Sequence, residues 1–233
     1  MRTYRTNAGP VRERPYYKLR EIEDICTEAL RQVDLYPSTP EPVRIERFIE
    51  KRFGVHPEYG ELPDGLLGYT KFGSQGVEEI VVSRALVEDG GQAAERQANS
   101  TLAHEAGHGL LQGHLFALED DLTSFFGSDI DPAASKILCR NPRPQGARGY
   151  DGRWWEFQAN QAIGALLLPR PLAVDTIRQL LNAGGVSGRQ TLQPEKRGQA
   201  VKTLAETFDV NPAVARIRLE DMFPESEASQ LSL

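Results

Sequence analysis

Two histidines four residues apart, His104 and His108, constrain the fold of this 233-residue chain more than any other feature. Residues four apart lie on one face of an α-helix, so the two imidazoles can reach the same metal ion. Glu105 lies about 100° around such a helix from His104, which lets its carboxylate reach a water bound to that ion. The pattern His-Glu-x-x-His therefore predicts a helix with a metal-binding face, between about residues 99 and 112, with Gly113 after its end.

The chemistry of these residue types favours zinc as the metal. Neutral imidazole is a common zinc ligand, and bound zinc lowers the pKa of water to about 7, which supplies a nucleophile at neutral pH. The alternative is a chance match on a helix with two surface histidines. One of residues 99–101 can cap the helix, and Leu102, Ala106 and Leu110 give it an apolar back. We therefore predict Zn²⁺ as the cofactor, the two histidines as ligands and the glutamate as the catalytic base.

A catalytic zinc site needs a third protein ligand, and two residues are candidates. The first, His114, lies six residues after His108, where metzincins have their third histidine. However, Leu111 occupies the position at which that motif requires glycine, and neither of the two methionines follows at a suitable place for a methionine turn. These departures favour an ordinary histidine just past the end of the helix.

The second candidate is Glu156, on a helix that we expect from Trp154 to Leu168, ended by Pro169. Two histidines and a glutamate are the ligand set of thermolysin-like enzymes. Asn160, one turn further along, could hold a ligand histidine by its free ring nitrogen. The alternative is a solvated glutamate at a helix start, where the helix dipole favours it, so the residue alone leaves both roles open. Small residues would let this helix approach the His104 helix closely: Ala159, Ala162, Gly164 and Ala165.

Taken together, the segments TLAHEAGHGLL and WEFQANQAIGALLLP resemble the ImmA/IrrE family of bacterial zinc metallo-endopeptidases, whose pattern joins an H-E-x-x-H helix to an E-x-x-A-N helix ending in Leu-Leu-x-Pro. The resemblance implies that Glu156 is the third ligand and that Asn160 matches the family's asparagine. It covers residues 100–169, and more weakly the C-terminal segment LAETFDVNPAVARIRLEDM. This chain departs from the pattern at Ala106, where a large apolar residue is usual, and in the long linker of residues 115–150.

The resemblance also implies a substrate. Members of the family are typically encoded beside a helix-turn-helix repressor and cut it at one site, which releases stress-response or mobile-element genes. A peptide can bind by adding a strand to a sheet edge, and the strand residues Ile80, Val81 and Val82 are the edge that we expect to be open. Tyr150, Arg153 and His114 are candidate partners for the oxyanion.

The alternative function is a DNA-binding or scaffolding regulator that retains a protease-like fold. Residues 204–219 have helix-turn-helix character, with Arg216 and Arg218 on the second helix. Charge argues against direct nucleic-acid binding, because residues 1–20 contain six of the 27 basic residues and the rest of the chain is strongly acidic. Zinc content distinguishes the two hypotheses, since a regulator need not retain the ligands and the base together.

We predict an α+β fold: a mostly helical, zincin-like (thermolysin-like) body around a small antiparallel sheet, with a C-terminal helical module. The hairpin comprises residues 66–72 and 77–83, and a short strand is expected at 137–139. No apolar run approaches the roughly 20 residues of a membrane span, and no secretory signal is visible, so a cytoplasmic location is expected. The predicted divisions are a flexible basic arm (1–18), the metallopeptidase domain (19–183), the helix-turn-helix-like module (184–223) and a frayed tail (224–233).

Overall fold

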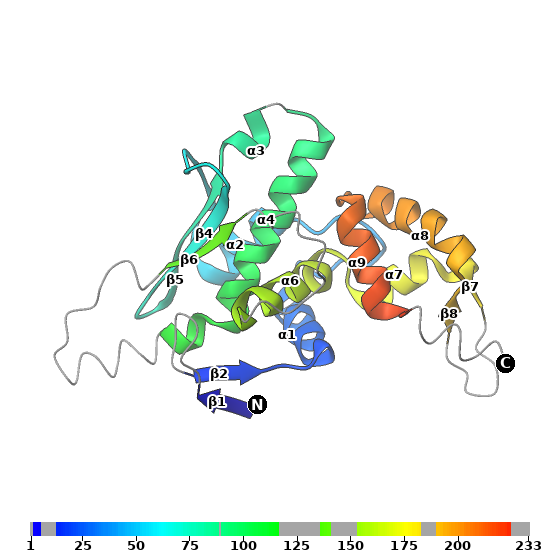
Figure 1. Cartoon of the computed structure of the whole chain (residues 1–233), viewed down its shortest axis with the longest axis horizontal. Helices are drawn as coiled ribbons and strands as arrows, with labels where there is room; N and C mark the ends of the chain where they lie inside the picture. The colour runs from blue at the N-terminus through cyan, green and yellow to red at the C-terminus, as the bar shows by residue number, and fades with distance from the viewer. Residues whose placement is uncertain are drawn as a thin grey trace.

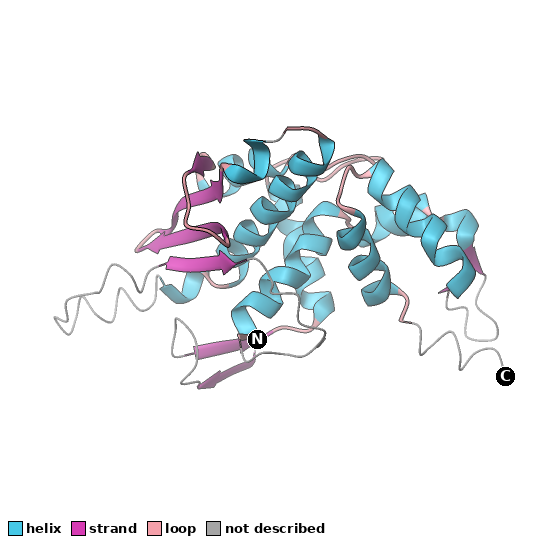
Figure 2. Cartoon of the chain, turned by 45° about the horizontal axis from the view of Figure 1, so that its top comes forward, coloured by secondary structure: helices cyan, strands magenta, loops and turns pink. Residues whose placement is uncertain are grey.

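The computed structural model describes residues 2–5, 13–88, 90–116, 136–140, 153–182 and 190–224. The fold is a mixed α+β arrangement, with a sheet on one side, helices through the centre and further helices at the C-terminal end (Figures 1 and 2). The elements in chain order are β1 (Arg2–Arg5), β2 (Glu13–Tyr16), α1 (Leu19–Gln32), α2 (Ile45–Phe53), β3 (Glu58–Gly60), β4 (Leu66–Gly73), β5 (Gly76–Ser83), α3 (Ala85–Glu88), α4 (Gln92–Leu111), β6 (Lys136–Arg140), α6 (Trp154–Leu167), α7 (Arg170–Thr176), the 3-10 helix η2 (Arg178–Leu180), β7 (Leu181–Asn182), β8 (Thr191–Leu192), α8 (Pro194–Thr207) and α9 (Pro212–Met222).

The main sheet has the strand order β3-β5-β4-β6. The predicted hairpin is confirmed, because β4 and β5 pair antiparallel around the tight turn between Gly73 and Gly76. The short strand predicted at residues 137–139 is also confirmed, since it lies within β6 and pairs antiparallel with β4. The prediction of a wholly antiparallel sheet is wrong, because β3 runs parallel to β5.

The prediction that Ile80, Val81 and Val82 form an open edge is also wrong. These residues lie on β5, which is paired on one side with β4 and on the other with β3, and all three side chains are buried. A strand whose two sides are already hydrogen-bonded cannot accept a peptide by strand addition. Strand β3 has only three residues, which is too short for an alternating pattern of side chains to predict it.

Helix α4 carries the His-Glu-x-x-His pattern and begins at Gln92, earlier than predicted. The hydroxyls of Ser100 and Thr101 do not cap the helix. Instead they donate to the backbone oxygens of Arg96 and Gln97, one turn earlier, at 2.8 and 3.1 Å. Serine and threonine can bond back to the preceding turn inside a helix, which explains why their presence did not mark its start.

The two helices of the site, α4 and α6, approach each other at Gly107. A Cβ atom on this glycine would lie 2.8 Å from the Cβ of Ala162 and 3.2 Å from the backbone oxygen of Ala159. Two of the small residues predicted to allow close packing of these helices, Ala159 and Ala162, therefore lie at the contact, whereas Gly164 faces Arg218 of α9. Helix α6 itself runs to Leu167 and ends before Pro169, as expected.

The C-terminal helices pack on the same core as the rest of the chain. Leu204, Phe208 and Leu219 belong to one buried hydrophobic cluster that also contains Ile22 and Leu102. As predicted, Asn211 caps α9: its side chain accepts a hydrogen bond from the backbone N–H of Ala213 at 2.9 Å, and Pro212 follows at the first helical position.

Arg218 on α9 does not face solvent. Its side chain is 1% exposed and its Nη1 lies 2.5 Å from Glu23 Oε1 on α1, while Nε donates to the backbone oxygen of Leu168. The regulator hypothesis requires the side chain of Arg218, on the second helix, to be accessible to DNA. This part of the hypothesis is wrong, because the side chain is buried. Arg218 lies on the same face of α9 as the buried Ala215 and Leu219, and this face packs on α6, where Arg218 Cδ would lie 3.0 Å from a Cβ atom added at Gly164.

At the N-terminus, β1 and β2 form a two-stranded antiparallel ladder in the segment whose composition predicts a loose arm, with Arg2 opposite Tyr16 and Arg5 opposite Glu13. The hairpin lies below α1 and α6 in Figure 1. The backbone oxygen of Pro15 accepts a hydrogen bond from Gln158 on α6 at 2.7 Å. None of the described helices combines the length and the apolar character that a bilayer crossing requires.

Candidate metal centre

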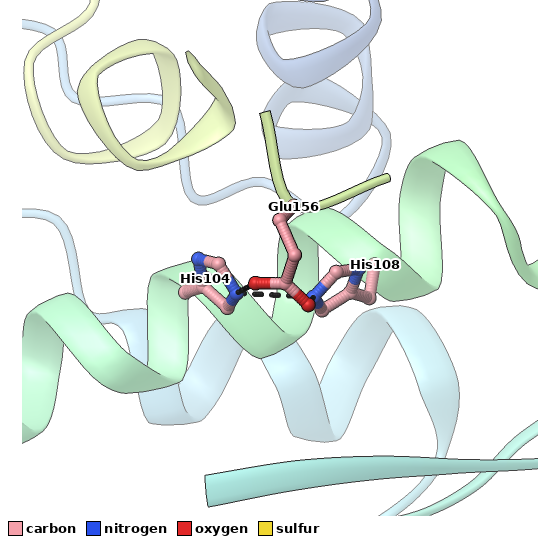
Figure 3. Close-up of side chains that lie close together, drawn as sticks. All are labelled: His104, His108 and Glu156. Carbon is pink, nitrogen blue, oxygen red and sulfur yellow. Dashed lines mark hydrogen bonds and ion pairs between the residues drawn. The ribbon is translucent and has the colours of Figure 1, made fainter. Parts of the chain in front are cut away.

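Two buried histidines from α4 and a glutamate from α6 converge on one point (Figure 3). His104 Nε2 lies 3.2 Å from Glu156 Oε2, and His108 Nε2 lies 3.7 Å from Glu156 Oε1. The two Nε2 atoms are 3.0 Å apart. Among the described residues, this is the group whose ligand atoms could together hold a metal ion.

The donor set fits zinc in both chemistry and spacing. Zinc binds histidine nitrogen and carboxylate oxygen at about 2.0–2.2 Å, so tetrahedral geometry separates its ligand atoms by roughly 3.3 Å. The observed separations of 3.0, 3.2 and 3.7 Å lie on both sides of that value. The group can therefore hold a metal ion with only small adjustments of the side chains.

The protonation states also suit metal binding. Burial, reinforced by the nearby His104, lowers the pKa of His108 to about 3, so its imidazole is neutral at pH 7. Burial alone would raise the pKa of Glu156. The hydrogen bond from His104 and the charges of His108, His104 and Arg153 outweigh burial and lower this pKa, so the carboxylate is ionised. Neutral imidazole and ionised carboxylate are the ligand forms that bind metals.

Glu105 is fully buried between α4 and the sheet. The hydroxyl of Thr70 on β4, itself fully buried, lies 2.6 Å from Glu105 Oε2 and 3.2 Å from the backbone oxygen of Glu105. Gly68, two residues earlier on the same strand, leaves room for the carboxylate, because a Cβ atom there would lie 3.1 Å from Glu105 Oε1. Strand β4 thus positions the residue that the sequence predicts to be the base.

The ring nitrogen of His108 that faces away from the other ligands is held by Gln112. Its Oε1 lies 3.0 Å from His108 Nδ1, and both side chains are fully buried. Asn160, predicted for this supporting role, is exposed, and the position at His108 Nδ1 belongs to Gln112. Gln112 can reach this nitrogen because it lies one turn after His108 on the same helix face.

The remaining predicted site residues lie elsewhere. His114, the competing third ligand, is exposed and does not belong to the group of described residues that could hold a metal ion. Arg153 is exposed at the start of α6, and Tyr150 falls outside the described residues. Sequence reasoning missed Thr70 and Gln112. The spacing of four residues from His108 could have identified Gln112, whereas no local signal relates Thr70 to Glu105.

A scan against protein-family models and searches of curated proteins and of solved structures found no match to this chain.

Proposed function

We propose that this protein is a zinc-dependent endopeptidase similar to the ImmA/IrrE family. The observation that carries the proposal is the convergence of the buried His104 and His108 with the half-buried Glu156, next to the buried Glu105. Two histidines and a glutamate, with a second glutamate adjacent to the first histidine, are the ligands and base of a thermolysin-like hydrolase.

In this proposal His104, His108 and Glu156 hold the zinc ion. When bound, zinc would lower the pKa of a coordinated water and polarise the carbonyl of the scissile peptide. Glu105 accepts a proton from the attacking water and passes it to the leaving amine. The hydroxyl of Thr70 keeps the Glu105 carboxylate in place while the proton is transferred.

For the substrate, the resemblance to the ImmA/IrrE family supports a helix-turn-helix repressor encoded near this gene, cut at one site in the cytoplasm during a stress or mobile-element response. Burial of Arg218 removes one of the two arginines on which a direct DNA-binding role would depend. We therefore propose a regulatory role through proteolysis of a repressor.

The decisive experiment compares the wild type with Glu105→Gln, which keeps the shape of the side chain and removes the base. Both proteins should bind about one zinc per chain, and the variant should cut the neighbouring repressor, or a peptide library if there is none, at least 10²–10⁴-fold more slowly. His114→Ala is the matched control for metal binding and should leave the zinc content unchanged, while Glu156→Ala should lose most of the zinc. Equal cleavage by the wild type and Glu105→Gln, or zinc retained by Glu156→Ala and lost by His114→Ala, would contradict the proposal.

A further inference from the structure

A continuous chain of buried hydrogen bonds runs from the metal centre to the N-terminal hairpin. His108 Nδ1 lies 3.0 Å from Gln112 Oε1, Gln112 Nε2 donates to Gln158 Oε1 at 2.8 Å, and Gln158 Nε2 donates to the backbone oxygen of Pro15 at 2.7 Å. His108 and Gln112 are fully buried, Gln158 is 5% exposed, and Pro15 is buried as well. We call His108, Gln112, Gln158 and Pro15 the amide relay.

The direction of every bond in the amide relay follows from its last member. A backbone carbonyl can only accept, so Gln158 must turn its NH₂ group toward Pro15 and its oxygen toward Gln112. Gln112 must then donate to that oxygen, which leaves its own oxygen facing His108. Because an amide oxygen can only accept, His108 must carry its proton on Nδ1, and the lone pair of the neutral ring is on Nε2.

That lone pair faces the other two ligands, since His108 Nε2 lies 3.0 Å from His104 Nε2 and 3.7 Å from Glu156 Oε1. The opposite tautomer would present an N–H group to the metal and could not bind it. Burial fixes which group donates and which accepts in each of these bonds, because water cannot replace a missing partner and a buried amide without one destabilises the fold.

We infer that Gln112 and Gln158 are positioning residues. The Pro15 carbonyl, which can only accept a hydrogen bond, fixes the orientation of both amide groups, and these in turn hold His108 in the tautomer that binds metal. The N-terminal hairpin is therefore a structural part of the metal centre, although Pro15 is 143 positions before Gln158 in the chain. The functional meaning of this inference rests on the proposed zinc enzyme, whereas the tautomer can be measured in the metal-free protein.

The chain has four histidines, so selective ¹⁵N labelling of histidine yields a spectrum simple enough to assign with His108→Gln. In the metal-free wild type near pH 8, His108 should show a protonated Nδ1 and an unprotonated Nε2. Gln158→Met removes both hydrogen bonds of that side chain at similar volume, frees Gln112 to turn over, and should convert His108 to a mixture of tautomers. Gln161→Met, the same change three residues later on α6, is the matched control and should leave the His108 signals unchanged.

A second variant separates the direction of the relay from loss of packing. In Gln158→Glu, the carboxylate can accept from Gln112 but cannot donate to Pro15, so His108 should keep its proton on Nδ1. The signals of His56 and His114 show whether Gln158→Met is folded. If it is not, Gln112→Glu and Gln112→Met provide the same contrast. The glutamate variant should retain the Nδ1-protonated tautomer of His108, and the methionine variant should lose it.

Zinc affinity provides the second readout, measured by competition with a chromogenic chelator. Gln158→Met and Gln112→Met should raise the zinc dissociation constant about 10–100-fold, whereas Gln161→Met should leave it unchanged. A wild type that binds no zinc would refute the proposed function but leave the tautomer test in force. The inference would be overturned if folded Gln158→Met and Gln112→Met both showed a single Nδ1-protonated tautomer of His108 and an unchanged zinc affinity. That result would leave the proposed function standing.

Discussion

At the scale of single residues, the hydroxyl of Thr70 lies 2.6 Å from a carboxylate oxygen of Glu105, and both side chains are fully buried. A hydrogen bond to a charged group contributes about 1.5–3 kcal/mol, which corresponds to roughly 10–100-fold in a rate if the bond holds the base in its working position. Thr70 is therefore expected to act through Glu105 and not through the metal ligands.

We predict that Thr70→Val, which keeps the branched shape and removes the hydroxyl, lowers kcat about tenfold or more with little change in KM or zinc content. Thr70→Ser keeps the hydroxyl and should restore most of the rate. Steady-state cleavage assays and zinc analysis of the three proteins measure these effects. If the valine and serine variants lose the same activity, the role of Thr70 is packing and not orientation of Glu105.

At the scale of elements, the spacing of α4 and α6 decides whether Glu156 can meet the two histidines. Gly107 permits the close approach, since a Cβ atom there would lie 2.8 Å from the Cβ of Ala162. Neither a helix backbone nor an alanine methyl can turn away, so an added methyl group must push the two helices apart.

Gly107→Ala should therefore destabilise the protein by about 1 kcal/mol or more, because overpacking costs about 1–3 kcal/mol and outweighs the gain of up to about 1 kcal/mol in helix propensity. It should also weaken zinc binding, since Glu156 moves with α6. Gly198→Ala in α8 is the matched control: nothing lies within 4 Å of its added Cβ, so that variant should be more stable than the wild type. Urea denaturation of the metal-free proteins measures both changes, and an increase in stability for Gly107→Ala would contradict the packing argument.

At the scale of the whole molecule, Glu23 joins three helices that are far apart in the sequence. Its carboxylate accepts hydrogen bonds from Arg170 of α7, at 2.8 and 2.9 Å, and from the buried Arg218 of α9. Burial works to raise the pKa of Glu23, but the hydrogen bonds and charges of the two arginines outweigh it and hold this pKa below its usual value of 4.5. The ionised form of Glu23 is thus the one that stabilises the fold.

Because the pKa of Glu23 is lower in the folded than in the unfolded chain, its contribution to stability is present above about pH 4.5 and is lost as the pH falls through the folded pKa. We predict that Glu23→Gln destabilises the protein at pH 7 by about 3–5 kcal/mol, since Arg218 is left as a buried charge without its carboxylate. The difference from the wild type should shrink in acid, where Glu23 is itself protonated. Urea midpoints at pH 7 and in acid test this, with the exposed Glu28→Gln on the same helix as the control; a difference that stays constant would contradict it.

Several local features of this protein could be predicted, because residues close together in the sequence determine them. The spacing of His104 and His108 places both on one helix face whatever surrounds the helix. Alternating side chains and a tight turn indicate the hairpin of β4 and β5, and Asn211 with Pro212 marks the start of α9. Each of these depends on interactions within a few positions of the chain, so the sequence alone determines them.

Only the tertiary structure decides which distant groups meet. The pairing of β3 with β5, which closes the expected edge at Val81 and Val82, depends on how whole segments bury their surfaces. The contacts of Thr70 with Glu105 and of Gln158 with Pro15 depend on the same packing. A buried polar group must find its partner wherever the packed chain brings a donor or an acceptor within reach, and no periodicity records that choice. The sequence therefore determines the ligand face of α4, while the fold determines what orients its histidines and its glutamate.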